Sequence, residues 1–589
     1  MTSITKQTVG KYTYLYESKS YWNQKKKRPE NKKTIIAKLD PLTNQPHYTQ
    51  QYLNQLTQTG QPTTGLKLWD KTQEKTINTT NIYRTDTQAT QAILDKTQDF
   101  GPTYFLEQLS QKIGLHPILQ QTLPQTWQEI FCLASYLITT NKPLMYCQDW
   151  IETNAGLNTN TPLTSQHISE LLASFGPQQR NNFYRTWHQH IQEQQYIALD
   201  LTALSTYSQQ IQAAEWGYNR DDENLPQINL CLLYGQTSKL PVYQTLYSGS
   251  LKDVSTLRST LQEFDALTNQ APLMLTLDRG YYSSKNIHLF LTQDQNGNSK
   301  YRFLLSVPFT TQFAKDQVVL ERESIDRLEN VVLTSGAPIR GVHRHRVWEK
   351  GVELEVHVFF NPEKALQVRN ELFGYVTWLA RQAAVKPDDA KLALEYKKYL
   401  LIHKSVQGEG GVVVEVCGGV VEAELAMCGW FVLLSNHIVD VQEAYDVYRL
   451  GDVVEKGFLR YKSNLGLDRV RVHGDLRMEN KLFVAFVALI LTAAICEGMR
   501  KHDLFGSLTF ERLFLVLAKL KCVCLNGQTI LRPLTREQVS IFEAFGIALP
   551  DYDTRKPVVP KKRGRKPKQP APETLLELLH HDLSNTNLG

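Results

Sequence analysis

Short apolar runs separated by polar turns dominate the middle of the chain. They predict strands at residues 196–206, 228–235, 240–249, 273–278 and 301–308, with a helix at 253–264 between the third and fourth strands. Strands that are apolar along their whole length are buried on both faces, so they require a sheet covered by helices. The pattern therefore predicts an α/β core.

The apolar spacing is helical before this core and irregular after it. Helical periodicity at residues 103–141 and 165–194 predicts a mainly helical region, which is either a DNA-facing module or a helical packing domain. Beyond residue 308 the pattern predicts an insertion with β content, after which a strand at 430–434 and a long helix at 441–465 resume the core. The polar first 100 residues predict only strands near 12–16 and 34–38.

The length of 589 residues exceeds what a single hydrophobic core holds, so the chain is expected to be multidomain. The predicted parts are a polar N-terminal region (1–100), a helical, DNA-binding domain (101–195), the first part of the core (196–308), the insertion (309–428), the second part of the core (429–550), and a basic disordered arm with a short C-terminal helix (551–589).

The cysteines and the N-terminus favour a reducing, cytoplasmic location. The eight cysteines are scattered, the Cys-x-Cys at 522–524 has no second pair for a zinc site, and no apolar signal-peptide core follows Met1. The longest apolar run, residues 482–496, is shorter than the roughly 20 residues that span a membrane, so a buried helix is expected and no membrane association.

Basic clusters at residues 25–28, 32–33 and 561–568 suit a polyanion. The last cluster contains Arg-Gly-Arg-Lys-Pro at 563–567, which is similar to an AT-hook for the minor groove of A·T-rich DNA. A basic tail without sequence preference and a nuclear-import signal are the alternatives. Lys562, Arg563 and Arg565 are therefore predicted DNA contacts.

Two of the apolar runs each contain one carboxylate, Asp200 and Asp278. An ionised Asp in a buried strand costs several kcal/mol unless a cation compensates it, so the pair indicates a shared metal. On the predicted helix 441–465, Tyr448, Glu455 and Lys462 follow one another at steps of seven and so share a face.

Two Asp and one Glu form an all-oxygen ligand set, which suits Mg²⁺ or Mn²⁺. Two such ions would support in-line attack on a phosphodiester, with Asp200, Asp278 and Glu455 as catalytic metal ligands. Tyr448 and Lys462 would hold the DNA backbone beside them. Two other interpretations remain: Asp278 could cap a helix, and Asp452 could replace Glu455 as the ligand.

The carboxylates, their strand order and the insertion before Glu455 resemble the RNase H-like DDE transposases of bacterial insertion sequences. The helix is similar to their cut-and-paste signature Tyr-x-x-Arg-x-x-x-Glu-x-x-x-x-x-x-Lys, except that Gly451 occupies the Arg position. Further similar runs lie at residues 215–221, 225–229, 278–283 and 469–473, and the resemblance extends from about residue 100 to 500.

The resemblance implies an RNase H-like catalytic core with a β-containing insertion domain, preceded by a mainly helical region. It implies a Mg²⁺-dependent transposase, located in the bacterial cytoplasm with the nucleoid, that cuts terminal inverted repeats of double-stranded DNA and joins them to target DNA. A homodimer in the synaptic complex and a hairpin intermediate are also implied, with Trp348 holding a flipped base. The alternatives are a related nuclease and an inactive or domesticated DNA-binding protein, which Gly451 favours.

Overall fold

The computed structural model forms two compact units, Met1–Lys96 and Thr97–Gly589. The residues that it describes are 2–9, 12–23, 28–40, 45–63, 66–69, 97–157, 159–193, 196–217, 223–251, 253–268, 273–293, 297–404, 412–467, 469–525 and 528–551. The predicted basic arm, with Lys562, Arg563, Arg565 and the C-terminal helix, lies outside these residues.

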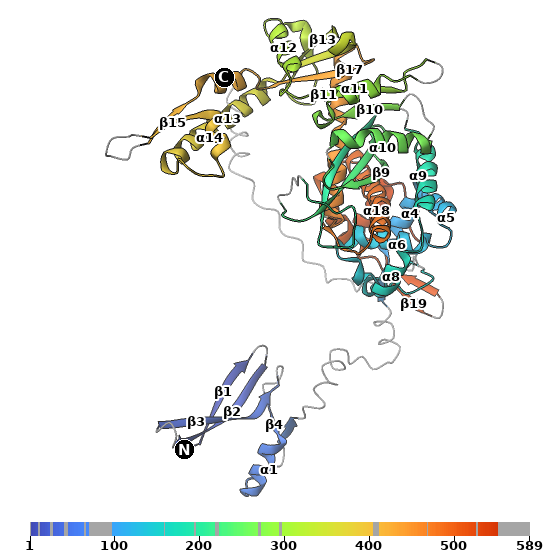
Figure 1. Ribbon diagram of the computed structural model, residues 1–589. Helices are drawn as coiled ribbons and strands as arrows, with labels where there is room; N and C mark the ends of the chain where they lie inside the picture. The colour runs from blue at the N-terminus through green and yellow to red at the C-terminus, as the bar shows by residue number, and fades with distance from the viewer. Residues whose placement is uncertain are drawn as a thin grey trace, which may run out of the picture. The chain divides into compact units, whose positions relative to one another are not determined.

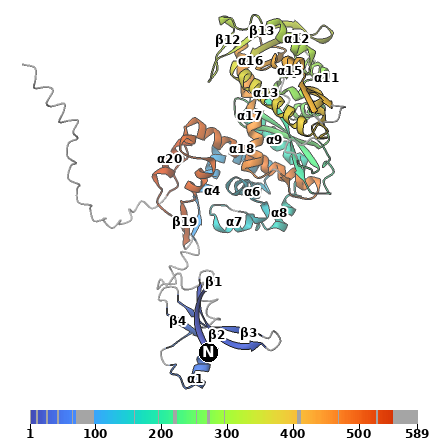
Figure 2. The same ribbon diagram turned by 90° about the vertical axis from the view of Figure 1, so that its left-hand side faces the viewer.

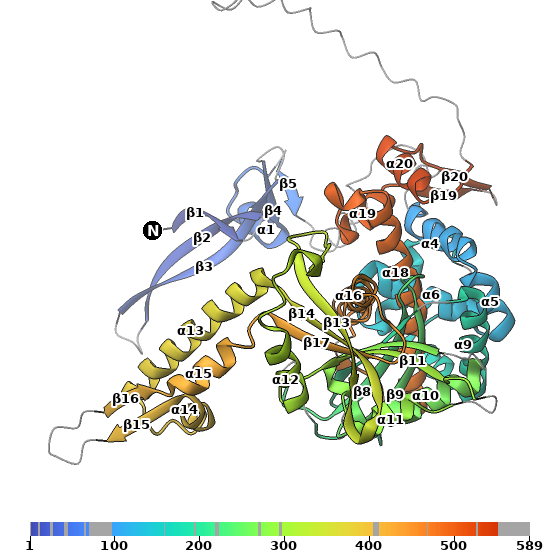
Figure 3. The same ribbon diagram turned by 90° about the horizontal axis from the view of Figure 1, so that it is seen from above.

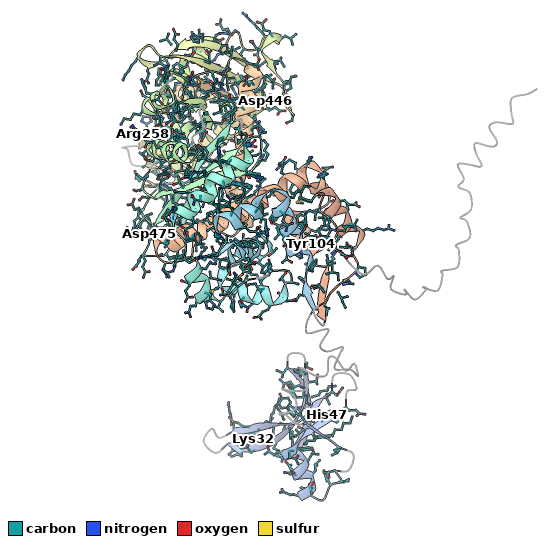
Figure 4. The ribbon with its side chains drawn as sticks, turned by 90° about the vertical axis from the view of Figure 1, so that its right-hand side faces the viewer. Lys32, His47, Tyr104, Arg258, Asp446 and Asp475 are labelled. Atoms are coloured by element: carbon teal, nitrogen blue, oxygen red, sulfur yellow. The ribbon has the colours of Figure 1, made fainter. Side chains whose placement is uncertain are left out.

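In its described residues the N-terminal unit has a five-stranded sheet and one helix, and the expected strands near 12–16 and 34–38 lie within its second and third strands. Lys32 and His47 on two of these strands are labelled in Figure 4. Its elements are β1 (Thr2–Val9), β2 (Tyr12–Asn23), β3 (Arg28–Leu39), β4 (Pro46–Thr49), α1 (Gln50–Gln58) and β5 (Lys67–Trp69).

The second unit begins with a strand followed by helices, as the helical spacing of this region predicts. These elements are β6 (Thr97–Asp99), α4 (Gly101–Lys112), α5 (Leu115–Thr122), α6 (Trp127–Thr140), η1 (Leu144–Tyr146), α7 (Cys147–Thr153), α8 (Ser165–Leu171) and α9 (Pro177–Ile191). Phe105 of α4 and Phe183 of α9 are buried on the apolar faces of their helices, whereas α6 is buried on all sides from Glu129 to Ile138.

The predicted core strands and helix are confirmed. They are β7 (Ile197–Thr206), β8 (Gln227–Gly235), β9 (Pro241–Ser248), α10 (Asp253–Thr268), β10 (Leu273–Leu277), η2 (Arg279–Tyr281), α11 (Ser284–Phe290) and β11 (Tyr301–Val307). These strands lie in the order β9-β8-β7-β10-β11, and β8 is antiparallel to both of its neighbours, whereas β7, β10 and β11 are parallel. Every residue of β8 is buried, so both faces of the sheet are covered there.

The segment between β11 and the last part of the core extends the same sheet. Its elements are α12 (Gln312–Glu321), η3 (Leu328–Asn330), β12 (Val331–Val332), β13 (Ile339–Val347), η4 (Glu349–Gly351), β14 (Glu353–Phe360), α13 (Pro362–Val385), α14 (Ala393–Tyr399), β15 (Leu400–Lys404), β16 (Val412–Val416), α15 (Gly418–Leu425) and β17 (Trp430–Ser435). β17 pairs with both β11 and β14, so the sheet continues as β11-β17-β14-β13-β12. The helices α13 to α15 and the hairpin β15-β16 project from it and have their own apolar cluster (Figures 1 and 3).

The remaining elements complete the core and close a small sheet with β6. They are α16 (Val441–Leu450), α17 (Asp452–Leu459), η5 (Arg460–Asn464), β18 (Arg469–Val470), α18 (Asp475–Lys501), η6 (Leu504–Gly506), α19 (Phe510–Leu517), β19 (Lys521–Leu525), β20 (Gln528–Leu531) and α20 (Arg536–Ala544). Figure 2 shows α20 and β19 beside α4, where the rings of Tyr104 and Phe542 lie 5.9 Å apart.

The helix α18 is the central core helix of this unit. By length and composition it could cross a bilayer, but 83% of its apolar window is buried inside the protein. Phe483 packs edge-on against Phe183 of α9 at 5.1 Å, and Phe486 packs against Tyr184 at 5.2 Å. The apolar run at 482–496 thus forms the buried helix expected from its length.

The expectation of one continuous helix over residues 441–465 is wrong. At Gly451 the chain makes a tighter turn, in which the Gly451 N–H donates to the Tyr448 carbonyl at 3.1 Å, and α17 begins at the next residue. Residues 460–464 then form a wider π-helical turn. Because the π-helical turn changes the angle per residue, the step of seven from Glu455 to Lys462 no longer keeps these two side chains on one face.

Candidate active site

Asp200 lies in the middle of β7 and is 8% exposed. Its Oδ1 accepts a hydrogen bond from the Leu201 N–H at 2.8 Å. β7 is parallel to β10, and the pairing of Leu277 with Leu199 continues directly to Asp278 and Asp200. The register therefore places the two carboxylates level with each other on adjacent strands.

Asp278 follows the end of β10 and is exposed, so the expectation that it lies within a buried strand is wrong. It occupies the cap position of η2, yet its side chain makes no capping hydrogen bond. This observation speaks against the alternative in which Asp278 serves only as a helix cap.

Glu455 lies on α17 and faces the same cavity as the two Asp residues. This cavity, which we call the carboxylate pocket, has a volume of about 180 Å³. It is lined by Ala198, Leu199, Asp200, Thr276, Leu277, Asp278, Tyr448, Arg449, Gly451, Asp452, Val454 and Glu455. Three segments that are far apart in the sequence thus bring four carboxylates to one pocket.

Asp452, the alternative ligand to Glu455, also lines this pocket, but its Oδ2 accepts from the Lys456 ammonium at 2.8 Å. In the part of the chain that the structure describes, no hydrogen bond or ion pair engages the Glu455 carboxylate. Glu455 is therefore the better placed of the two to accept a cation or a substrate.

Tyr448 closes one side of the pocket and stacks on Phe431 with ring centroids 5.5 Å apart. Burial raises the pKa of its phenol, and the nearby carboxylate of Asp278 raises the pKa further. The hydroxyl stays protonated at neutral pH and can donate a hydrogen bond to an anionic oxygen.

Lys462 does not line the carboxylate pocket, contrary to the expected alignment with Tyr448 and Glu455. It lies in the π-helical turn η5 and lines a separate cavity with Lys142, Arg471 and Lys481. The wider turn carries Lys462 away from the face on which Glu455 lies.

Arg449 lines the pocket, although a continuous helix would have directed it away from the position of Gly451. The pocket lies against the junction of α16 and α17. Neighbouring residues on both sides of this junction, such as Arg449 and Asp452, therefore line the pocket together. From the sequence, Arg449 is excluded as a substitute for the signature Arg, because residues two positions apart on a continuous helix are about 200° apart around its axis. The break between α16 and α17 removes this objection, and it has no periodic signal in the sequence.

Trp348 is not available to hold a base. It is 4% exposed, and its indole N–H donates to the Tyr282 hydroxyl at 3.1 Å. Its ring also lies 5.8 Å from that of His288. These contacts make Trp348 a packing residue between η4 and the core.

The donor set of the pocket fits a hard divalent cation, because all of its acidic ligands are carboxylate oxygens and Mg²⁺ and Mn²⁺ prefer oxygen. Within the described residues, no group of three or more His, Cys, Asp or Glu side chains is arranged to hold one metal ion. The four carboxylates therefore line the pocket without forming a closed ligand shell.

Comparison with known proteins identifies the family. The profile of the family described as "Transposase DDE domain" matches residues 191–491, which is more than half of the chain and contains Asp200, Asp278 and Glu455. The chain therefore belongs to the transposase DDE domain family. No match was found among curated proteins.

Among solved structures, a piggyBac transposase in a synaptic complex with hairpin DNA, determined by cryo-electron microscopy, is similar to the chain. The two are 10% identical, the similarity covers 67% of this chain and 70% of that chain, and the TM-score is 0.33.

Proposed function

We propose that this protein is a DNA transposase that binds the ends of its element, cleaves them and joins the 3′-hydroxyls to target DNA. One observation carries this proposal: Asp200, Asp278 and Glu455 come from three distant segments and line one pocket inside the region that matches the family. Double-stranded DNA, as terminal inverted repeats and as target, is the proposed substrate, and a homodimer in the cytoplasm, associated with the nucleoid, is the proposed working form.

The strand arrangement supports an RNase H-like core. In sequence order the five core strands lie as third, second, first, fourth, fifth, and only the second is antiparallel to the others. Asp200 on the first strand and Asp278 after the fourth are then neighbours because those two strands are adjacent. Glu455 approaches from a helix on the face of the sheet.

The carboxylates are proposed to hold two Mg²⁺ or Mn²⁺ ions. Such ions, when bound, activate an attacking hydroxyl and stabilise the leaving oxygen of a phosphodiester. The Tyr448 hydroxyl would donate to a phosphate oxygen, and Lys462 would contact the backbone outside the pocket.

The test compares Asp200→Asn, Asp278→Asn and Glu455→Gln with Asp452→Asn. We expect each of the first three variants to lose cleavage by about 100-fold to 1000-fold or more, the loss seen when one preorganised catalytic group is removed, while end binding stays nearly intact. Cleavage of a labelled element end in Mg²⁺ and a gel shift measure the two activities.

Asp452→Asn should retain most of the cleavage activity, because the Asp452 carboxylate already forms an ion pair with Lys456. Loss of activity in Asp452→Asn but not in Glu455→Gln would reverse the ligand assignment.

We also expect Mg²⁺ or Mn²⁺ to support cleavage and Ca²⁺ to support at most assembly, because Ca²⁺ takes more ligands in a looser geometry. Strong cutting in EDTA would exclude a metal-dependent mechanism.

Two alternatives make different predictions in the same assays. A related RNase H-like nuclease would cut element ends but never join the 3′-hydroxyl to a target plasmid. An inactive or domesticated protein, which Gly451 at the signature Arg position favours, would bind DNA and do neither.

A further inference from the structure

Two cavities of about 430 and 420 Å³ adjoin each other outside the carboxylate pocket. They share Pro143, Leu144, Arg471 and Lys481, so they form one continuous groove, which we call the basic groove. One wall comes from the helical region at the end of α6 and from α8, and the other comes from η5 and the loop after β18.

The lining of the basic groove is cationic. No Asp or Glu is among the described residues that line either cavity. The basic residues that line it are Lys142, Lys462, Arg471, His473, Arg477 and Lys481. Such a one-signed cleft with low-dielectric walls concentrates a polyanion.

Three acidic residues near the groove have partners outside its lining. Glu479 pairs with Arg180, and Asp475, labelled in Figure 4 at the start of α18, accepts from the Gln212 N–H at 2.9 Å. Glu223 accepts from the Arg469 Nε at 3.0 Å, and this hydrogen bond and, to a smaller extent, the charge of Lys462 lower the pKa of Glu223. Among the described residues, these carboxylates lie beside the groove and not in its lining.

Lys481 gives the floor of the groove a partly desolvated charge. It is on α18 and only 6% exposed, yet it lines both cavities. Electrostatic attraction is stronger in such a low-dielectric setting than at an exposed surface, so an anion in the groove would interact more strongly with Lys481 than with a surface lysine.

The two walls are fixed to each other. The Asn141 side-chain amide donates to the Ser463 carbonyl at 2.7 Å and joins the end of α6 to η5. On the other side the Arg477 Nε donates to the Ser169 carbonyl at 3.1 Å and joins α18 to α8. The groove is therefore preorganised, and binding an extended anion in it requires little ordering.

Lys462 connects the basic groove to the carboxylate pocket along the chain. It lies seven residues after Glu455, in the π-helical turn that directly follows α17.

We propose that the basic groove binds the sugar–phosphate backbone of duplex DNA whose scissile phosphodiester lies in the carboxylate pocket. This inference rests on the proposed transposase function and assigns Lys142, Arg471 and Lys481 to DNA binding together with Lys462. The helical region then holds DNA through the end of α6 and not through an inserted recognition helix.

The experiment uses the full-length chain and a fluorescent 30-base-pair duplex. Lys142→Gln/Arg471→Gln removes two groove charges, and Lys519→Gln/Arg512→Gln removes two exposed charges outside the groove as a matched control. Fluorescence anisotropy between 50 and 200 mM salt gives the slope of log affinity against log salt. Thermal unfolding checks that each variant remains folded.

We expect the groove variant to bind more weakly, with a slope shallower by about 1.8, because each phosphate contact contributes about 0.9. The control should retain the wild-type slope. An unchanged slope in the folded groove variant, or an equal loss in both variants, would overturn the proposal.

Cleavage assays separate this inference from the proposed function. If the salt slope of the groove variant is shallower than that of the wild type, but the wild type cuts no phosphodiester in Mg²⁺, the groove assignment stands and the transposase proposal fails. If the wild-type protein cuts and joins DNA while the groove variant binds and cuts as the wild type does, the groove assignment fails alone. Stronger binding of a single strand than of the duplex would also overturn it.

Discussion

Arg449 is the only Lys or Arg among the described residues that line the carboxylate pocket, which four carboxylates also line. A charged hydrogen bond to phosphate contributes about 1.5–3 kcal/mol, so Arg449→Gln should lower kcat/KM for end cleavage by about 10-fold to 100-fold. Arg327→Gln, which removes an exposed charge far along the chain, is the control and should have little effect. Cleavage rates at several DNA concentrations measure the change.

Gly451 limits what can replace the missing signature Arg. A Cβ atom at this position would lie 3.0 Å from the Tyr448 carbonyl oxygen and 3.2 Å from the Thr276 Cγ2, closer than most real contacts. Gly451→Arg should therefore not increase cleavage. If it does, and Arg449→Gln has no effect, the phosphate contact belongs to position 451 and not to Arg449.

That Asp200, Asp278 and Glu455 would lie near one another could be predicted from the sequence, but their surroundings could not. A carboxylate in an apolar strand needs a partner, which singles out Asp200, and the steps of seven from Tyr448 and to Lys462 single out Glu455. The position of Lys462 depends on a hydrogen-bonding pattern in η5 that leaves no trace in residue spacing. Arg449 is excluded only if the helix is continuous, and the break at Gly451 removes that condition.

At the level of elements, the contact between α6 and the chain after η5 depends on Gly466. Its φ is 62°, and a Cβ there would lie 2.1 Å from the Asn141 Oδ1. Gly466→Ala should reduce the free energy of unfolding by about 1–2 kcal/mol from backbone strain alone, with more from the collision. Gly506→Ala, where a Cβ would meet nothing within 4 Å, should change stability little. Urea unfolding of both variants tests this, and equal stabilities would contradict the packing described.

His357 on β14 should make the protein less stable in mild acid. It is fully buried, and burial lowers its pKa to about 4, below the 6.5 of an unfolded chain. The unfolded state then takes up the proton first, so stability that is present above about pH 6.5 decreases as the pH falls toward 4. The loss is at most about 3 kcal/mol at 1.36 kcal/mol per pKa unit.

Urea unfolding at pH 7 and pH 4.5 measures this dependence. His357→Leu should flatten the pH dependence, whereas His502→Leu at the exposed end of α18 should leave it unchanged. His437, whose pKa burial also lowers to about 4, accounts for part of the remaining slope. A slope in His357→Leu equal to that of the wild type would refute the assignment.

The core strands were predictable because each is a short apolar run with polar residues on both sides. The pairing of β17 with both β11 and β14 was not, because strand partners far apart in sequence are chosen by the fold and not by local pattern. The sequence predicted an insertion with β content, but it did not indicate that these strands would extend the core sheet.

On the scale of the whole molecule, the basic arm at residues 561–568, which lies outside the described residues, adds positive charge for DNA binding. Residues 561–568 carry six cations in eight positions, and each phosphate that they neutralise adds about 0.9 to the salt slope. Deleting residues 554–589 should weaken DNA binding and flatten its salt dependence, without removing catalysis at low salt. Anisotropy titrations measure both effects.

A full-length variant in which these six residues are Gln separates charge from chain length and should behave as the deletion does. If the arm is a minor-groove hook, the loss should be greater on A·T-rich than on G·C-rich duplexes. Equal losses would leave a basic tail without sequence preference, and no loss would show that the arm does not bind DNA.

The carboxylate pocket is divided along the chain, because Glu455 follows Asp200 by 255 residues. Ribosomes add about 5–20 residues per second, so roughly 13 to 50 s separate the synthesis of these two residues. A chain that ends before Glu455 also lacks Lys462, Arg471 and Lys481, which follow Glu455 in the sequence. The carboxylate pocket and most of the basic groove are therefore completed together, late in synthesis, and a truncated translation product has neither.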